Sequence, residues 1–415
     1  MKKLFTSIMS LSIVAALLVG CGAGDTETGS EKSADGTVNL EFFQFKQEAV
    51  GTFDTLIKKF EEENPNIKIT QNNVPESDTV LMSRLTQNDL PEIMSINGNV
   101  TYGELARAGV LYDFTGNENV DRIIPSYFEM IGRITGSDQI HGLPHSANAN
   151  TVLYNKTKFE ELGLEIPTTW DELMEIAEKI EAAGETPFFS TYGEAWTVLP
   201  PWNALASNLH GDDFFDKLAA GETTFSERYR EVSEKMLMLL DYTDNDVFGS
   251  NYGLGNAAFA NGESVMYMQG IWAIGQIKDA NPDIEVGAFA LPATNDPDAN
   301  RLVSGVDILL TMSADAKHPE EAKKFIDFLL KEENMQFYID QQKLFSAVEG
   351  VIQEDPTVID LRPNFEEGRI TSFADHYYFP GMGFDNLIQE LLIKKDVDSF
   401  LQTLDNEYDK VKARQ

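Results

Sequence analysis

The sequence has only one cysteine, Cys21, among its 415 residues, which excludes an intrachain disulfide. Basic residues are also scarce, because 32 Lys and Arg stand against 68 Asp and Glu and give a formal net charge of -36 at pH 7. A chain this acidic and without a basic patch does not fit a nucleic-acid partner. Beyond the first 20 residues there is no apolar run of 18 residues, so we expect no membrane-spanning helix in the remainder.

Motifs of several enzyme classes are also missing. There is no G-x-S-x-G, no H-E-x-x-H and no phosphate-binding G-x-x-x-x-G-K. The histidines are scattered, so we predict no histidine-based metal site. Asp296 and Asp298 resemble the start of a calcium loop, but Arg301 stands where glycine is needed. We therefore expect neither an enzyme nor a cofactor. The many acidic residues leave an extracellular glycoside hydrolase with paired carboxylates as an alternative.

What is present is typical of a folded protein of two domains. Hydrophobic residues make up 42% and aromatic residues 10% of the chain, and its length suffices for two sizeable cores. Alternating apolar residues predict strands at 38–45, 67–69, 90–96, 284–290 and 301–311. Helical periodicity predicts helices at 53–60, 167–184 and 318–331. This alternation of elements predicts an α/β fold with helices on both faces of each sheet.

The first residues have the pattern of an export signal. Lys2 and Lys3 precede a mostly apolar run, and the four residues 18–21 (LVGC) resemble the lipobox of bacterial lipoproteins. We therefore predict a signal peptide at 1–20, acylation of Cys21, and a flexible lipidated tether at 21–36. This interpretation places the protein at the extracytoplasmic face of the cell membrane. The alternative is a secretory peptide that is cleaved elsewhere.

One stretch, residues 257–277, carries the strongest indication of function. A helix ends at Asn261-Gly262, a strand spans 263–268, and Gly270 separates this strand from a second helix. Trp272 follows at the carboxyl end of the strand, where ligands bind in open α/β sheets. An indole offers an apolar face and one N–H donor, which suits the apolar face and hydroxyl rim of a sugar ring. The alternative is that Trp272 is a core residue.

The spacing of this stretch resembles that of a known family. The F-x-x-G-x-x-x-M-x-x-x-G-x-W segment of maltose-binding-protein-like sugar-binding proteins of ABC importers is matched by Phe259, Gly262, Met266, Gly270 and Trp272. Further similar segments are F-E-x-x-N-P-x-I-K-I at 60–69, G-x-P and Y-N-K within 142–156, P-T-T-W-D-E-L at 167–173 and E-A-x-K-F-I-x-F-L at 321–329. In that family this tryptophan stacks on the bound sugar, and the resemblance implies the same role here.

The resemblance implies a two-lobed periplasmic-binding-protein-like fold, with a sheet flanked by helices in each lobe and three crossings between the lobes. The first lobe is expected at 37–146 and 305–332 and the second at 147–304 and 333–415, with the third crossing near 330–336. The implied function is capture of a sugar, such as an oligosaccharide, by a monomer that delivers it to an ABC transporter permease. A Gram-positive source is implied too. An alternative is the same fold binding a cationic or peptide solute.

The candidate ligand contacts fall at strand exits and in aromatic loops. They are Gln44, Phe45, Gln47 and Asn97 in the first lobe, His145 and Asp307 at the crossings, and Glu194, Trp196, Trp272 and Phe379 in the second lobe. The aromatic rings are predicted to stack on sugar faces and the polar groups to bond hydroxyls. For His145 a hinge or core role is equally open, and the run around Phe379 fits either a cleft rim or a core. Trp202 is predicted to be a core residue.

Overall fold

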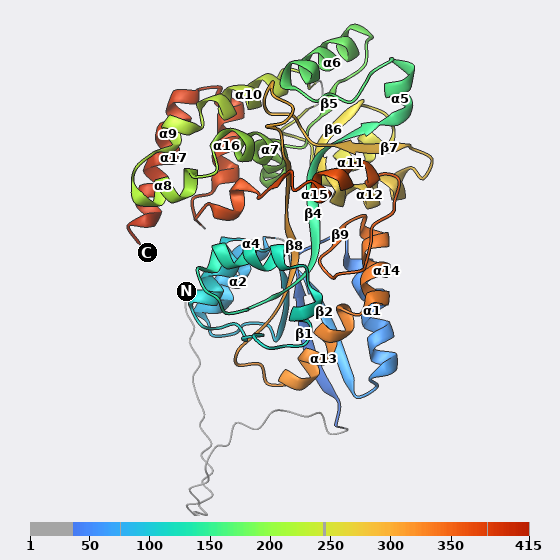
Figure 1. Ribbon diagram of the computed structural model, residues 1–415, viewed down its shortest axis with the longest axis vertical. Helices are drawn as coiled ribbons and strands as arrows, with labels where there is room; N and C mark the ends of the chain where they lie inside the picture. Colours follow the sequence, from blue (N-terminus) through green and yellow to red (C-terminus); the bar gives the residue numbers. More distant parts are fainter. Residues whose placement is uncertain (1–35, 75, 244–245, 380, 415) are drawn as a thin grey trace, which may run out of the picture.

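The computed structural model describes residues 36–414, apart from residues 75, 244–245 and 380. The predicted signal peptide, the acylated Cys21 and nearly the whole tether lie outside these residues. Within them the chain forms two α/β lobes joined by long strands (Figure 1). No helix in this part of the chain combines the length and the apolar character that a bilayer-spanning helix needs.

A single path of paired strands runs through both lobes in the order β2-β1-β3-β8-β4-β6-β5. The strands are β1 (Val38–Gln44), β2 (Ile67–Asn73), β3 (Ile93–Ile96), β4 (Leu143–Asn155), β5 (Phe188–Phe189), β6 (Met266–Gly270), β7 (Val286–Phe289), β8 (Leu302–Met312), β9 (Phe345–Ser346) and β10 (Ile370–Thr371). The six predicted strands are confirmed as β1, β2, β3, β6, β7 and β8, with ends that differ by at most four residues. Because β4 and β8 are long and pair with strands of both lobes, they frame the junction.

Helices cover both faces of the sheet in the first lobe. One layer has α1 (Val50–Glu63), α13 (Pro319–Leu329) and α14 (Glu332–Gln342), and the other has α2 (Ser77–Thr86), α3 (Val100–Arg107) and α4 (Pro125–Thr135). Phe42 of β1 packs edge-on against Phe53 of α1 and Phe325 of α13, with ring centroids 5.0 and 5.3 Å apart. Both partners belong to the apolar stripes that predicted these helices, so the buried faces follow from helical periodicity.

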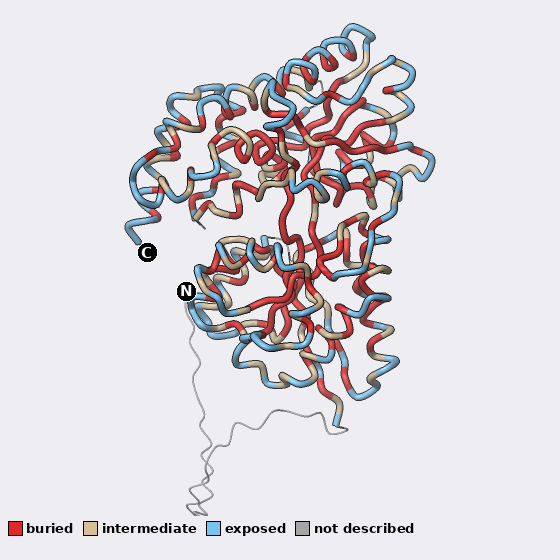
Figure 2. The backbone as a smooth tube through the Cα atoms, viewed as in Figure 1, coloured by how far each residue is buried: buried red, intermediate tan, exposed pale blue. Residues whose placement is uncertain are grey.

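In the second lobe the sheet separates two helical layers, because side chains alternate along β6. Tyr267 packs in the same core as α11 (Tyr252–Ala260) and α12 (Ile274–Ala280), whereas Met266 and Met268 face the other core. That other layer contains α6 (Trp170–Ala182), α7 (Leu199–Leu209), α10 (Arg230–Leu240), α16 (Phe384–Lys394) and α17 (Val397–Lys412). The remaining elements are α5 (Lys156–Glu161), α8 (Phe214–Ala220), α9 (Phe225–Arg228), α15 (Arg362–Glu366) and the short 3-10 helices η1 (Val120–Arg122), η2 (Ala195–Val198), η3 (Ile271–Ala273), η4 (Ile359–Leu361) and η5 (Ala374–Tyr377). Buried residues follow the strands through both lobes (Figure 2).

Three segments join the lobes, namely β4, β8 and the chain between Glu349 and Pro356. The backbone N–H of Glu349 bonds to the first lobe, and the carbonyl of Pro356 accepts from Lys156 in the second. The third crossing was predicted at 330–336, and this position is wrong. Gln342 of α14 donates to Thr52 of α1 at 2.8 Å, so α14 packs with the first lobe and the crossing follows it.

Candidate functional site

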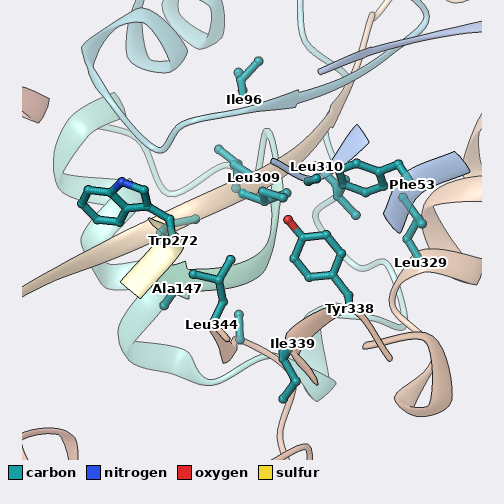
Figure 3. Close-up of a cluster of buried hydrophobic side chains, with 14 of the residues drawn as sticks. Phe53, Ile96, Ala147, Trp272, Leu309, Leu310, Leu329, Tyr338, Ile339 and Leu344 are labelled. Atoms are coloured by element: carbon teal, nitrogen blue, oxygen red, sulfur yellow. The ribbon is translucent and has the colours of Figure 1, made fainter. Parts of the chain in front are cut away.

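Trp272 lies in η3, directly after β6. Gly270 at the end of β6 pairs with Asn150 of β4, and a Cβ on Gly270 would meet the Trp272 ring at 1.9 Å. The indole therefore lies against the bare backbone of the strand end, which explains why glycine stands two residues before it. The ring is 9% exposed, and its Nε1 has no hydrogen-bond partner among the described residues. It belongs to the core that spans the junction, beside Ala147 of β4 (Figure 3).

An aromatic pair lies in the same lobe as Trp272, where the loop before η2 meets α11. The ring of Trp196 contacts the ring of Tyr252 edge-on, with centroids 5.0 Å apart and planes at 64°. Glu194 accepts the backbone N–H of Tyr252 at 2.9 Å, and the side chain of Asn251 caps α11. These bonds fix the start of α11 against the loop, so Trp196, Tyr252 and Glu194 form one unit.

The first lobe approaches this unit through the loop that follows β1, residues 45–48. Phe45 and Glu48 are partly buried in this loop, and Gln47 is exposed. Burial, together with the negative charge of Glu48, raises the pKa of the Tyr252 hydroxyl well above its ordinary value. Phe45 packs against the same core cluster as Tyr252 and Trp272, so loop 45–48 and the start of α11 both border the junction.

Buried polar side chains gather in the second lobe near the aromatic pair. Tyr252 has Asn256 as its hydrogen-bonding neighbour, and Tyr267 has Thr191 and Gln269. The amide nitrogen of Asn256 is engaged by Gln276 at 2.7 Å, so its carbonyl oxygen is the group left for Tyr252. Buried polar groups are normally hydrogen-bonded, and the Nε1 of Trp272, which has no partner among the described residues, points to a polar ligand nearby.

Two predicted ligand contacts, Gln44 and Asp307, form hydrogen bonds within the protein. The amide of Gln44 is fully buried, accepts the N–H of Lys46 at 2.7 Å and donates to Gln71 at 2.8 Å. Asp307 is 2% exposed and accepts from Lys46 and from Asn148. Both side chains therefore hold the loop after β1 in place, and their hydrogen-bonding groups are already engaged within the protein.

His145 and Phe379, two further predicted contacts, pack against aromatic rings. His145 is fully buried, its ring lies edge-on to Tyr338 at 4.8 Å, and burial lowers its pKa to about 3. Neither of its ring nitrogens has a hydrogen-bond partner among the described residues. Phe379 stacks on Tyr408 of α17 at 5.2 Å between ring centroids. For both residues the structure corresponds to the core interpretation. Trp202 is fully buried as predicted, and its Nε1 donates to the Tyr378 hydroxyl at 3.0 Å.

The remaining predicted contacts differ in how far they are buried. Phe45, Asn97, Glu194 and Trp196 are partly buried, Gln47 is exposed, and Trp272 is covered. Glu48 and Tyr252 join them, although the sequence pattern did not single them out. For Glu48 a signal was available, because it lies in the exit loop of the first strand. Tyr252 could be found only once the caps of α11 were known.

No cofactor or metal site emerges at this junction. The described residues contain no group of three or more His, Cys, Asp or Glu side chains that could hold a metal ion. Two hollows lie elsewhere on the described surface, one of about 390 Å³ at the N-terminal end of β1 and one of about 60 Å³ between α16 and α17. At the junction, Trp272 and Tyr252 are both less than a tenth exposed.

Two α/β lobes on crossing strands, with aromatic rings and unpaired polar groups where they meet, define a solute-binding protein. The chain belongs to the family described as bacterial extracellular solute-binding proteins, whose sequence model matches residues 46–336. The family and the relatives described below are binding proteins rather than enzymes.

Known relatives agree in name and in structure. The multiple sugar-binding protein of Streptococcus mutans is 30% identical over 353 residues, which cover 83% of this chain and 82% of that protein. The binding protein RafE in complex with raffinose is 28% identical, with a TM-score of 0.81 over 91% of this chain and 100% of that one. The apo form of RafE from Streptococcus pneumoniae is 27% identical and has a TM-score of 0.72 over 93% and 100%. The chain thus superposes more closely on the raffinose complex.

Proposed function

We propose that this protein captures an oligosaccharide between its lobes and delivers it to the permease of an ABC importer. The observation that carries this proposal is Trp272, whose ring lies on Gly270 at the junction with its N–H unpaired. Relatives named for multiple sugars and for raffinose support a saccharide ligand. The acidic side chains near the junction do not require a cationic ligand, because ionised carboxylates also accept strong hydrogen bonds from sugar hydroxyls.

The contacts divide by chemistry. Trp272, Trp196 and Phe45 supply rings for the apolar faces of the sugar units. Glu194, Glu48, Gln47 and Asn97 accept or donate hydrogen bonds to hydroxyls, and the Tyr252 hydroxyl adds one more. Closing the lobes on the ligand buries these bonds and creates the surface that the permease recognises.

The family to which the chain belongs is extracellular. We further propose that the protein is a monomer and that acyl chains on Cys21 hold it at the cell membrane. Labelling cells with a palmitate analogue tests the anchor. The label is expected on the wild-type chain and not on Cys21→Ser. Label on the variant, or release of the wild type into the medium, would contradict the anchor without touching the binding proposal.

Calorimetry on the Cys21→Ser chain tests the binding itself, with raffinose, stachyose and maltotriose as probes. We expect one-to-one binding of at least one of them, with a Kd of about 1 µM or tighter. The recovered sugar should carry no new reducing ends, since a hydrolase would release them. Absence of binding to every saccharide, with salt-sensitive binding of a cationic solute or peptide, would replace this proposal by the alternative ligand class.

A further inference from the structure

A buried ion pair lies under loop 45–48, where the two lobes join. The Lys46 ammonium donates to both carboxylate oxygens of Asp307, at 2.9 and 2.8 Å, and the two side chains are each 3% exposed. Glu48 lies on the other side of the ammonium at 3.1 Å. A single buried cation thus joins one carboxylate of a crossing strand to one carboxylate of the ligand-facing loop.

Asp307 occupies an irregular point of the crossing strands. In the β4–β8 ladder Ser146 pairs with Ile308 and Ala147 with Val306, so Asp307 has no ladder partner. Bulges of this kind bend a strand and redirect a side chain. Here the redirected carboxylate also accepts the amide of Asn148 from β4 at 2.8 Å, so it holds both crossing strands and the loop.

The charge on Lys46 persists despite its burial. Burial alone lowers the pKa of this ammonium, but the charges of Asp307 and Glu48 outweigh that effect and raise the pKa above its ordinary value. The loop is further tied by its own strand, because the N–H of Lys46 donates to Gln44. These bonds tie the loop to its own strand and to the crossing strand β8.

From this arrangement we infer that Lys46 and Asp307 are positioning residues, whose ion pair fixes loop 45–48 to both crossing strands and so couples ligand contact by the loop to the angle between the lobes. Neither side chain needs to touch the ligand for this role. The inference rests on the proposed function for its ligand readout. Its second readout, the distance between the lobes, does not depend on any ligand.

The test compares paired substitutions in the Cys21→Ser chain. Lys46→Met with Asp307→Leu removes both charges of the buried pair, and Glu48, whose side chain is 13% exposed, keeps its charge and loses one partner. Lys46→Gln with Asp307→Asn is the second variant, for use if the apolar pair does not fold. Lys46→Arg keeps the charge. The matched control is Glu41→Gln with Arg84→Met, which removes a two-pronged ion pair at 2.7 and 2.9 Å on the same β1 strand.

Two quantities are measured, the Kd for raffinose and the ligand-free distance distribution between spin labels at Lys58→Cys and Lys179→Cys. These positions are exposed on α1 and α6, one in each lobe. In the paired variant we expect Kd to rise at least about tenfold, since a loop that is no longer preorganised binds more weakly. The distance distribution should broaden. Lys46→Arg and the control pair should stay within about twofold of the parent Kd, with its distribution.

The outcomes separate the two proposals. An unchanged Kd and an unchanged distribution in the paired variants would overturn the inference, and so would a weaker Kd with an unchanged distribution, because the coupling would then be absent. A parent protein that binds no saccharide would overturn the proposed function instead. In that case the ligand-free distances still decide the role of the ion pair.

Discussion

Loop 45–48 of the first lobe and the facing surface of the second lobe use their polar groups differently. In the loop, Lys46 is saturated by Asp307 and Glu48, and neighbouring Gln44 has both ends of its amide engaged. On the facing surface the Nε1 of Trp272 is buried and has no partner among the described residues, and the buried hydroxyl of Tyr252 has only the side chain of Asn256 beside it. The comparison indicates that the first lobe supplies a fixed wall, whereas the second lobe supplies most of the open hydrogen-bonding capacity.

The largest expected effect is in the second lobe. Trp272→Ala should weaken raffinose binding by about 3 kcal/mol, roughly 100-fold, because a large central aromatic residue is lost from the interface. Calorimetry on the folded variant measures this. Trp202→Phe is the control, since it removes a fully buried indole and should lower thermal stability while leaving the Kd unchanged. Equal affinity in Trp272→Ala and wild type would place the ligand away from the second lobe.

His145 lies between the two regions and gives a prediction on pH. Its folded pKa of about 3 is below the unfolded value, so the unfolded state binds more protons between pH 6.5 and 3. Stability from this residue is complete above pH 6.5 and falls by about 2 kcal/mol by pH 5. His145→Phe, which cannot titrate, should therefore lose less stability than wild type between pH 7 and 5 in urea denaturation. Parallel losses in the two proteins would show that the imidazole is not buried at the crossing.

Gly270→Ala tests whether the strand end must be bare under the indole. The added methyl would meet the Trp272 ring at 1.9 Å and displace it, and we expect a loss of binding of about 1.5 kcal/mol by calorimetry. Gly275→Ala on α12 is the matched control. Its Cβ would be 3.7 Å from the nearest described atom, an ordinary contact. If both variants bind equally, the ring is not held by the strand end.

The smallest effect sharpens the comparison most directly. Tyr252→Phe removes one buried hydroxyl of the second lobe and should reduce affinity by about 1 kcal/mol, as expected for one hydrogen bond to the ligand. Tyr338→Phe removes a fully buried hydroxyl in the first lobe and should leave affinity as it is. Calorimetric titration of both variants with raffinose compares the loss of affinity caused by removing one hydroxyl from each lobe. A larger loss in Tyr338→Phe would reverse the assignment of the open polar groups.

Much of the architecture could be predicted because burial leaves a local periodic trace. The stripe that contains Phe53 and the alternation of β1 and β8 were visible in the sequence, and so was the glycine before Trp272. The site was only partly predictable. Gln44 and Phe379 were expected to contact the ligand, but Gln44 bonds to Gln71 and Phe379 stacks on Tyr408. No local sequence pattern predicts those partners.

The sequence by itself determined the α/β fold and the place of Trp272 at a strand exit, since both follow from spacing over a few residues, and its resemblance to a known family implied the solute-binding class. Only the tertiary structure decided that α14 packs on α1 and that Lys46 neutralises Asp307, which is 261 positions away along the chain. The reason is physical. Periodicity records which face of an element is buried, but a charge or an amide is matched by whichever group the folded chain brings within about 3 Å of it.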